Sequence, residues 1–271
     1  MPRAAKLLIG TSGWSYRSWR GPFFPAELGP ARHLEFYAGR FPTTELNGVF
    51  YRTPTVEAVS SWAERTPRDF VFAWKASKFI THWKRLGDSS RNSLDLLESR
   101  LRLLGDKAGP VLFQLPPPFK KNRERLASFI KLLSRNRNYA FEFRHPSWYE
   151  DDVLDLLRDS DTALCISDHH DAPSPWIATA RHVYIRGHGP GGRYRDHYSP
   201  RALGEWAQRL RMLGRKHRAI YVYFDNDQKS AAPRDAERLM TIMDVVGPAI
   251  SRNGRASGPR RTGSELPITD P

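Results

Sequence analysis

The sequence predicts an α/β fold of the (β/α)8 TIM-type barrel class. Eight short apolar runs recur along the 271 residues, and most of them end in charged or amide side chains. Helical patterns separate most of the runs, which is typical of β-α units joined into a parallel sheet. Eight such units close into a barrel whose functional residues lie at the carboxyl ends of the strands. The predicted strands are Leu7–Gly10, Thr43–Asn47, Phe70–Lys75, Pro110–Leu115, Tyr139–Arg144, Thr162–Asp168, His182–His188 and Ala219–Asp225.

Capping residues mark several of the intervening helices. Asn92 and Asn122 each precede apolar residues at helical spacing, and Ser199 is followed by a proline suited to the first helical position. A final helix is expected around residues 236–243, closed by Gly247 and Pro248. The connection between the sixth and seventh runs reads HHDAPSP over residues 169–175 and leaves little room for a helix. We therefore expect the sixth helix to be shortened or replaced by a loop.

Length and composition favour one domain. A barrel of this type needs about 250 residues, so we assign residues 1–247 to a single barrel domain. Residues 248–271 are rich in Gly, Pro, Ser and Arg without apolar periodicity, which predicts a disordered basic tail. No apolar stretch approaches the length of about 20 residues that spans a membrane. The only cysteine, Cys165, excludes an internal disulfide, and we expect a cytoplasmic protein.

The net charge is unusually positive. Lys and Arg number 43 against 29 acidic residues, a net charge of +14, of which residues 248–271 contribute only +2. The remaining +12 belongs to the barrel and favours polyanions or phosphorylated ligands as partners. A solvated basic surface without a partner is the alternative interpretation.

Alternation along the strands indicates where the polar residues point. In residues 140–144 Glu142 and Arg144 share one face while two phenylalanines share the other, and the same pattern pairs Glu45 with Asn47 and Arg186 with His188. The apolar face must meet the helices, so the polar side chains point into the barrel near its mouth. The full set of candidate mouth residues comprises Glu45, Asn47, Lys75, Gln114, Glu142, Arg144, Asp168, Arg186, His188, Asp225 and Asn226.

Buried charges are costly, so these groups must neutralise one another, meet water or bind a ligand. An internal network, such as Glu142 with Arg144 or Lys75, would need no ligand. For the whole set we favour a binding site, because a barrel folds without such a ring. Aromatic residues in the predicted mouth loops, Trp14, Tyr51 and Trp83 among them, suit stacking against bases or sugars.

Ordered motifs along the chain resemble the YecE-like family, known as domain of unknown function 72. The matching segments are residues 10–16 (GTSGWSY), 44–47 (TELN), 72–76 (FAWKA), 81–82 (TH), 112–117 (LFQLPP), 141–145 (FEFRH), 166–168 (ISD) and 223–227 (YFDND). The likeness spans roughly residues 7–240, and Asp235 departs from the asparagine expected in the last helix. The resemblance implies a barrel of the kind shared with sugar isomerases and an apurinic-site endonuclease, and it supplies no reaction.

Our first hypothesis is a protein that binds a phosphorylated ligand at the mouth, with nucleic acid preferred over a small metabolite. Arg144, Arg186 and Lys75 would hold the anion. Hydrolysis of a phosphate or N-glycosidic bond would suit Glu142 and Asp168 for proton transfer and His188 as the acid. The other mouth residues would also contact the ligand, together with Trp14, Tyr51 and His82.

Two alternatives stay open. A sugar or sugar-phosphate isomerase or lyase would use Glu45 and Glu142, with or without a divalent metal. The three cations in the mouth make a metal cage the less favoured arrangement. The second alternative is a binding protein without catalytic activity, in which the ring of polar residues has only a structural role.

Overall fold

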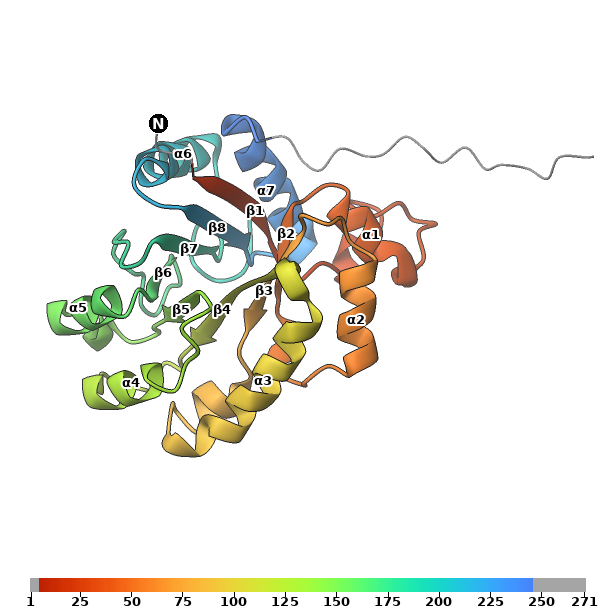
Figure 1. Cartoon of the computed structure of the whole chain (residues 1–271). Coiled ribbons are helices and arrows are strands. Elements are labelled where there is room, and N and C mark those ends of the chain that lie inside the picture. The colour runs from red at the N-terminus through yellow and green to blue at the C-terminus, as the bar shows by residue number, and fades with distance from the viewer. Residues whose placement is uncertain (1–4, 246–271) are drawn as a thin grey trace, which may run out of the picture.

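The computed structural model describes residues 5–245, which form a closed barrel of eight parallel strands in sequence order (Figure 1). The predicted fold is therefore confirmed, while the tail predicted at residues 248–271 lies outside the described residues. The strands are β1 (Lys6–Ser12), β2 (Thr43–Leu46), β3 (Val71–Lys75), β4 (Ala108–Gln114), β5 (Tyr139–Glu142), β6 (Ala163–Ser167), β7 (His182–Gly187) and β8 (Ala219–Phe224).

Helices surround the barrel in Figure 1 and cover the outer face of the strands. They are α1 (His33–Ala38), α2 (Val56–Glu64), α3 (Arg91–Leu103), α4 (Arg123–Ile130), α5 (Asp151–Asp159), α6 (Pro200–Gly214) and α7 (Ala231–Ile242). No helix connects β6 to β7, as the sequence predicts for this fully described segment.

Two of the predicted caps are confirmed and one is wrong. The side chains of Asn122 and Ser199 accept hydrogen bonds from the backbone of Arg125 and Ala202 at the starts of α4 and α6. The helix α3 instead begins at Arg91, because a 3-10 turn over Asp88–Ser90 already leads the chain into it. The last helix ends at Ile242, earlier than the Gly-Pro pair suggested.

Side-chain alternation separates two cores. Leu46, Phe141, Phe143 and Ile185 lie in the large apolar cluster between strands and helices, as predicted. The barrel interior is filled by alanines, by larger aliphatic residues such as Leu8 and Leu112, and by the rings of Tyr184, Tyr221 and Tyr223. Polar side chains lie above this inner layer, at the carboxyl ends of the strands.

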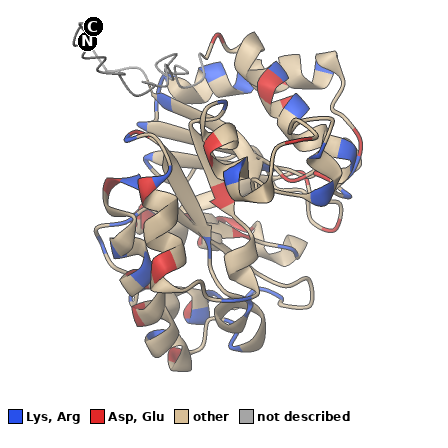
Figure 2. Cartoon of the chain, turned by 90° about the vertical axis from the view of Figure 1, so that its right-hand side faces the viewer, with Lys and Arg blue, Asp and Glu red and all other residues tan. Residues whose placement is uncertain are grey.

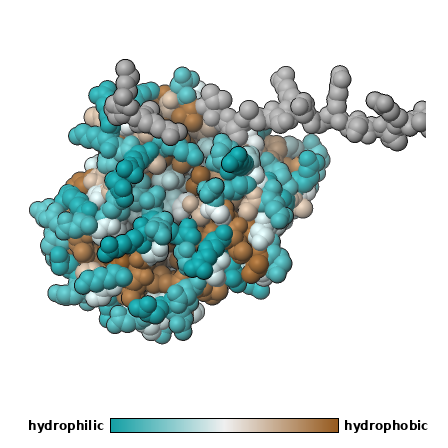
Figure 3. Space-filling view, in the orientation of Figure 1, coloured by the Kyte–Doolittle hydropathy of each residue, from teal (hydrophilic) through white to brown (hydrophobic). Residues whose placement is uncertain are grey.

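The outer surface carries mixed charge and polarity. Basic and acidic segments are interspersed in the view of Figure 2, and polar side chains surround separate apolar patches in Figure 3. The positive charge is thus spread over the elements seen in Figure 2. Within residues 5–245 no helix combines the length and apolarity needed to cross a membrane.

Candidate functional site at the barrel mouth

Arg186 lies at the centre of the polar ring. Its guanidinium, fully buried at the end of β7, donates to Glu45 through Nε (3.0 Å) and Nη2 (2.9 Å), and to Asp225 through Nη2 (2.7 Å). Nη1 donates to Glu142 (2.8 Å) and contacts Nε2 of His188 (3.0 Å). These bonds occupy the N–H donors of the guanidinium. Its charge is neutralised within the protein, and a contact of Arg186 with a ligand anion stays a prediction.

Glu142 and Arg144 form a second buried pair. Arg144 Nη2 lies 2.6 Å from Glu142 Oε1, which is the internal pair that the sequence left open. Burial alone would raise the pKa of Glu142, but Arg144 and Arg186 outweigh it and hold this pKa well below its usual range. Arg144 is only partly satisfied, since its Nη1 donates to the hydroxyl of Tyr194 (2.9 Å) while its buried Nε has no partner. This side chain retains donors for a ligand.

His188 is buried between the two arginines. Its Nε2 lies 3.0 Å from Arg186 Nη1 and 3.3 Å from Arg144 Nη2, while Nδ1 lies 3.3 Å from Asp168 Oδ1. Arginine only donates, so Nε2 accepts and the ring proton lies on Nδ1, facing Asp168. Burial and the two arginines hold the pKa of His188 well below its usual value. The imidazole is therefore neutral, and the role of His188 as the acid stays a prediction.

Asp168 lies beside the ring of polar residues around Arg186 and is not part of it. Its carboxylate accepts hydrogen bonds from the backbone N–H of His188 (2.7 Å) and from the hydroxyl of Tyr198. It lines a separate cavity of about 340 Å³ next to the start of α6. Burial raises the pKa of Asp168 to about 6, so this carboxyl exchanges its proton near neutral pH.

Lys75 is the mouth cation without an ion pair. Its side chain is almost buried at the end of β3, and no carboxylate of the described residues lies within 4.0 Å of its amine. The amine donates to Asn47 Oδ1 (3.2 Å) and lies 4.5 Å from the centre of the Phe50 ring. Burial and the charge of Arg186 lower the pKa of Lys75 to about 8.

A cluster of positive charge surrounds His82, which follows β3 on a π-helical turn (Phe79–Trp83). Burial, together with the charges of Lys75, Lys78, Arg144 and Arg85, lowers the pKa of its ring to about 4. We call the part of the mouth formed by Lys75, His82 and Arg144 the cationic sector, in which Lys75 and Arg144 carry the charge and the His82 ring is neutral.

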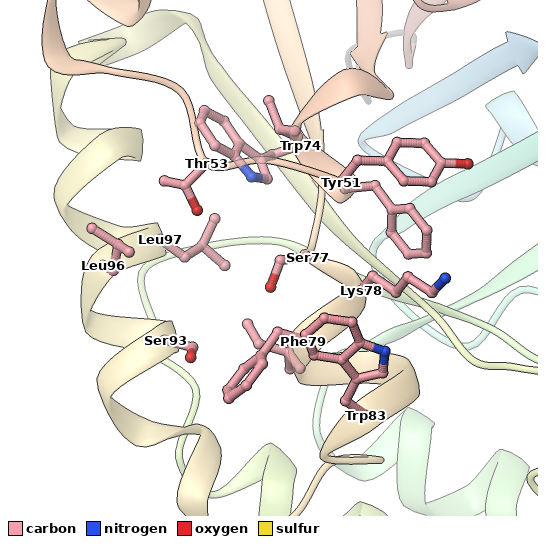
Figure 4. Close-up of a pocket in the computed structure, with 13 residues that line it drawn as sticks. Tyr51, Thr53, Trp74, Ser77, Lys78, Phe79, Trp83, Ser93, Leu96 and Leu97 are labelled. Carbon is pink, nitrogen blue, oxygen red and sulfur yellow. The ribbon is translucent and has the colours of Figure 1, made fainter.

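A cavity of about 550 Å³ adjoins this sector between the π-helical turn and α3. Phe50 forms part of its wall, and the same ring contacts Lys75 and His82 (ring centres 5.1 Å apart). Figure 4 shows Lys78 between Tyr51 and Trp83, with α3 forming the opposite wall. Tyr51 is 76% exposed and Trp83 is 69% exposed, so both rings are open to a partner.

Several predicted residues lie elsewhere. Asn226 is buried and donates to Asp235 (2.9 Å) and to the carbonyl of Asp196 (2.7 Å), so it fixes a loop onto α7. Gln114 donates to the backbone of Leu115 (2.8 Å). Trp14 packs edge-on against Trp62, outside the ring. The roles of Asn226 and Trp14 as ligand residues stay predictions.

The sequence reasoning missed the hydroxyl groups that support the ring. Ser12 donates to Glu45 Oε1 and Tyr184 donates to Glu45 Oε2 (2.6 Å). Ser167 donates to Glu142 (3.2 Å). Ser12 and Glu45 are register partners on β1 and β2, and Ser167 faces Arg186 across β6 and β7. Inward positions at the ends of strands were the signal that could have identified them.

The mouth does not fit a divalent metal. Glu45, Glu142 and Asp225 direct their oxygens at the guanidinium of Arg186, which fills the space that a shared ion would need. Elsewhere in the described chain, His169, His170 and Asp171 have ligand atoms within 4.8 Å of one another. These are successive residues of one loop, and His170 pairs with Asp171 (3.1 Å).

Comparisons with known proteins agree with this architecture. The chain is 24% identical to the UPF0759 protein YunF of Bacillus subtilis over 88% of its length and 95% of that protein. It is 31% identical to the UPF0759 protein YecE of Escherichia coli K12 over 53% of its length and 50% of that protein. The crystal structure of a DUF72 family protein from Thermotoga maritima superposes with a TM-score of 0.79 at 27% identity, covering 88% of this chain and 99% of that one. The family model described as protein of unknown function DUF72 matches residues 8–258, and the chain therefore belongs to this family.

Proposed function

We propose that the protein binds a phosphorylated ligand at the cationic sector, with nucleic acid as the favoured class. The observation that carries this proposal is the contrast between the cations of the mouth. Arg186 is neutralised by three carboxylates, whereas Lys75 has none within 4.0 Å among the described residues and Arg144 has a free buried Nε. An anion at the sector would satisfy donors that the protein leaves open.

The neighbouring cavity favours a ligand that carries a base or sugar beside its phosphate. Phe50 is shared by both sites, so one ligand can contact the sector and the cavity together. Exposed rings such as Tyr51 and Trp83 are suited to stacking with unpaired bases. Lys78, which lies between them in Figure 4, is suited to contact the phosphates of the nucleic-acid backbone. Single strands should therefore bind more tightly than duplexes.

Catalysis, where it occurs, would be hydrolysis of a phosphate or N-glycosidic bond with Asp168 moving the proton. Asp168 is suited to this role because its pKa is raised to about 6. Glu142 is not, because its arginine partners keep it ionised. Binding without turnover corresponds to the non-enzymatic alternative.

The direct test is fluorescence anisotropy with labelled single-stranded and duplex oligonucleotides at fixed salt. We expect Lys75→Gln and Arg144→Gln each to weaken single-strand binding by about tenfold, the effect of losing one charged hydrogen bond. Arg102→Gln, at a 75% exposed side chain in the last turn of α3, is the matched control and should leave the affinity unchanged. Equal affinities for all four proteins would overturn the proposal.

A further inference from the structure

Lys75 differs from the other cations of the mouth in its surroundings. Its side chain is 7% exposed and its amine is contacted by an amide oxygen and by the face of an aromatic ring, those of Asn47 and Phe50. Both contacts are compatible with an uncharged amine, since neither partner is an anion. Asn47 and His82 beside it are only partly buried, so the amine lies just below an opening of the mouth.

The charged groups around Lys75 come from four other strands. Arg186 on β7 opposes a positive charge on the amine, while Glu45, Glu142 and Asp225 from β2, β5 and the end of β8 favour it. The three carboxylates are each tied to Arg186, so they support the lysine only from a distance. Burial adds to the effect of Arg186 and holds the pKa of Lys75 at about 8.

We propose that Lys75 is a nucleophile that forms an imine with the aldehyde of a phosphorylated ligand. The claim that Lys75 reacts with an aldehyde rests on the surroundings of Lys75 alone. The claim that the ligand carries a phosphate rests on the proposed function. Arg144, with its free Nε, is the neighbouring donor that would hold the phosphate while the carbonyl carbon reaches the lysine. Desolvated lysines beside a second cation are suited to this chemistry.

The reaction needs no other reactant. The lone pair of the Nζ amine forms a bond to the carbonyl carbon, and the π electrons of the C=O bond move to oxygen. One N–H proton passes to that oxygen and gives a carbinolamine. The hydroxyl then leaves with the second N–H proton as water, while the nitrogen lone pair forms the C=N bond. Amine and aldehyde are thus converted to imine and water, with no change in oxidation state.

Reductive trapping tests the inference on the wild-type protein. The protein is incubated with sodium cyanoborohydride and one of three probes, and the modified lysine is identified by peptide mass mapping. The probes are glyceraldehyde 3-phosphate, glyceraldehyde and an oligonucleotide that carries a single aldehyde. The first and third distinguish a small sugar phosphate from a nucleic acid as the source of the phosphorylated aldehyde.

We expect one dominant adduct at Lys75 from a phosphorylated probe. At pH 7 a lysine of pKa about 8 has a neutral fraction on the order of a hundredfold larger than an ordinary lysine. Labelling of Lys75 should reach half its maximum near pH 8. Lys75→Arg should abolish the adduct, and Lys216→Gln, at an exposed residue after α6 that lines neither the mouth nor the cavity, should keep it. Labelling spread over exposed lysines with Lys75 unmodified would overturn the inference.

The outcomes separate this inference from the proposed function. An unmodified oligonucleotide that binds, together with no adduct at Lys75, would overturn the imine chemistry alone. Equal labelling of Lys75 by glyceraldehyde and by both phosphorylated probes would support the nucleophile and overturn the role of phosphate.

Discussion

Two carboxyl groups on either side of His188 differ in protonation because their neighbours differ. Asp168 is paired with neutral hydrogen-bond donors, so burial raises its pKa to about 6. Glu142 faces two arginines, whose charges outweigh burial and keep it ionised. At the residue scale, the cations select which acid can exchange a proton near neutral pH.

Asp168→Asn should remove a pH dependence of stability. A carboxyl whose pKa is about 6 when folded and 3.8 in the reference state binds more protons in the folded protein. Its contribution to stability is therefore greatest below the lower value and is lost as pH rises through 6. Wild type should gain stability over Asp168→Asn between pH 7 and pH 5, measured as the difference in free energy of unfolding in urea. Parallel profiles for the two proteins would contradict the raised pKa.

Alternation predicted the direction of these side chains but not their partners. Glu142 and Arg144 are two residues apart on one strand, so their shared face followed from the sequence. The six bonds of Arg186 did not, because five of them go to residues at the ends of four other strands and depend on how the barrel closes. Residue type alone could not show that Arg186 is neutralised while Lys75 is not.

At the scale of the elements, close contact between strands limits residue size. Gly10 on β1 lies against β2, where an added Cβ would be 2.1 Å from the carbonyl oxygen of Thr43. The backbone oxygen cannot move without breaking the pairing of β1 with β2. A side chain at this position is therefore incompatible with the observed strand spacing.

Gly10→Ala should destabilise the barrel by at least the cost of overpacking, about 1–3 kcal/mol. Gly204→Ala is the matched control, because Gly204 lies within α6 and an added Cβ there meets nothing within 4 Å. That control should raise stability by about 0.5–1 kcal/mol through helix propensity. Both effects are read from thermal melts followed by circular dichroism, and a Gly10→Ala protein as stable as wild type would refute the contact.

Element types were easier to predict than element ends. The apolar runs identified all eight strands, and Pro-rich residues 169–175 identified the missing sixth helix. The start of α3 was missed because a 3-10 turn precedes it, and such turns depend on packing more than on a capping residue. The helix α7 ends before the expected glycine, because the backbone of Asp244 adopts a left-handed conformation (φ 54°).

At the scale of the whole molecule, one side chain connects strands from all around the barrel. Arg186 on β7 bonds to Ser12 on β1, Glu45 on β2, Glu142 on β5 and Asp225 after β8. The charges of three buried carboxylates thus depend on a single guanidinium, with Arg144 as the second partner of Glu142.

Arg186→Met should cost about 3–5 kcal/mol of stability, the range for breaking a buried ion pair from one side. The loss should shrink at low pH, because protonation of the uncovered carboxyls relieves their repulsion. Tyr184→Phe removes only one bond to Glu45 and should cost about 1 kcal/mol. Equal stabilities of the two variants in urea denaturation would show that Arg186 does not neutralise the ring.

The overall architecture followed from the sequence because eight repeated units have one common way to close. The binding site followed only in part. The ring of polar residues exists, but much of it is internally paired, and the free donors lie toward β3 and β5. That asymmetry arises from distances across the barrel, which no local pattern encodes.

The most direct test of the central claim is the salt dependence of single-strand binding. Each phosphate held by a cation adds about 0.7 to the slope of log affinity against log salt concentration. We predict that the double variant Lys75→Gln/Arg144→Gln has a slope shallower than wild type by about 1.4. An unchanged slope, with Arg102→Gln as the reference, would contradict the claim that these two cations bind phosphate.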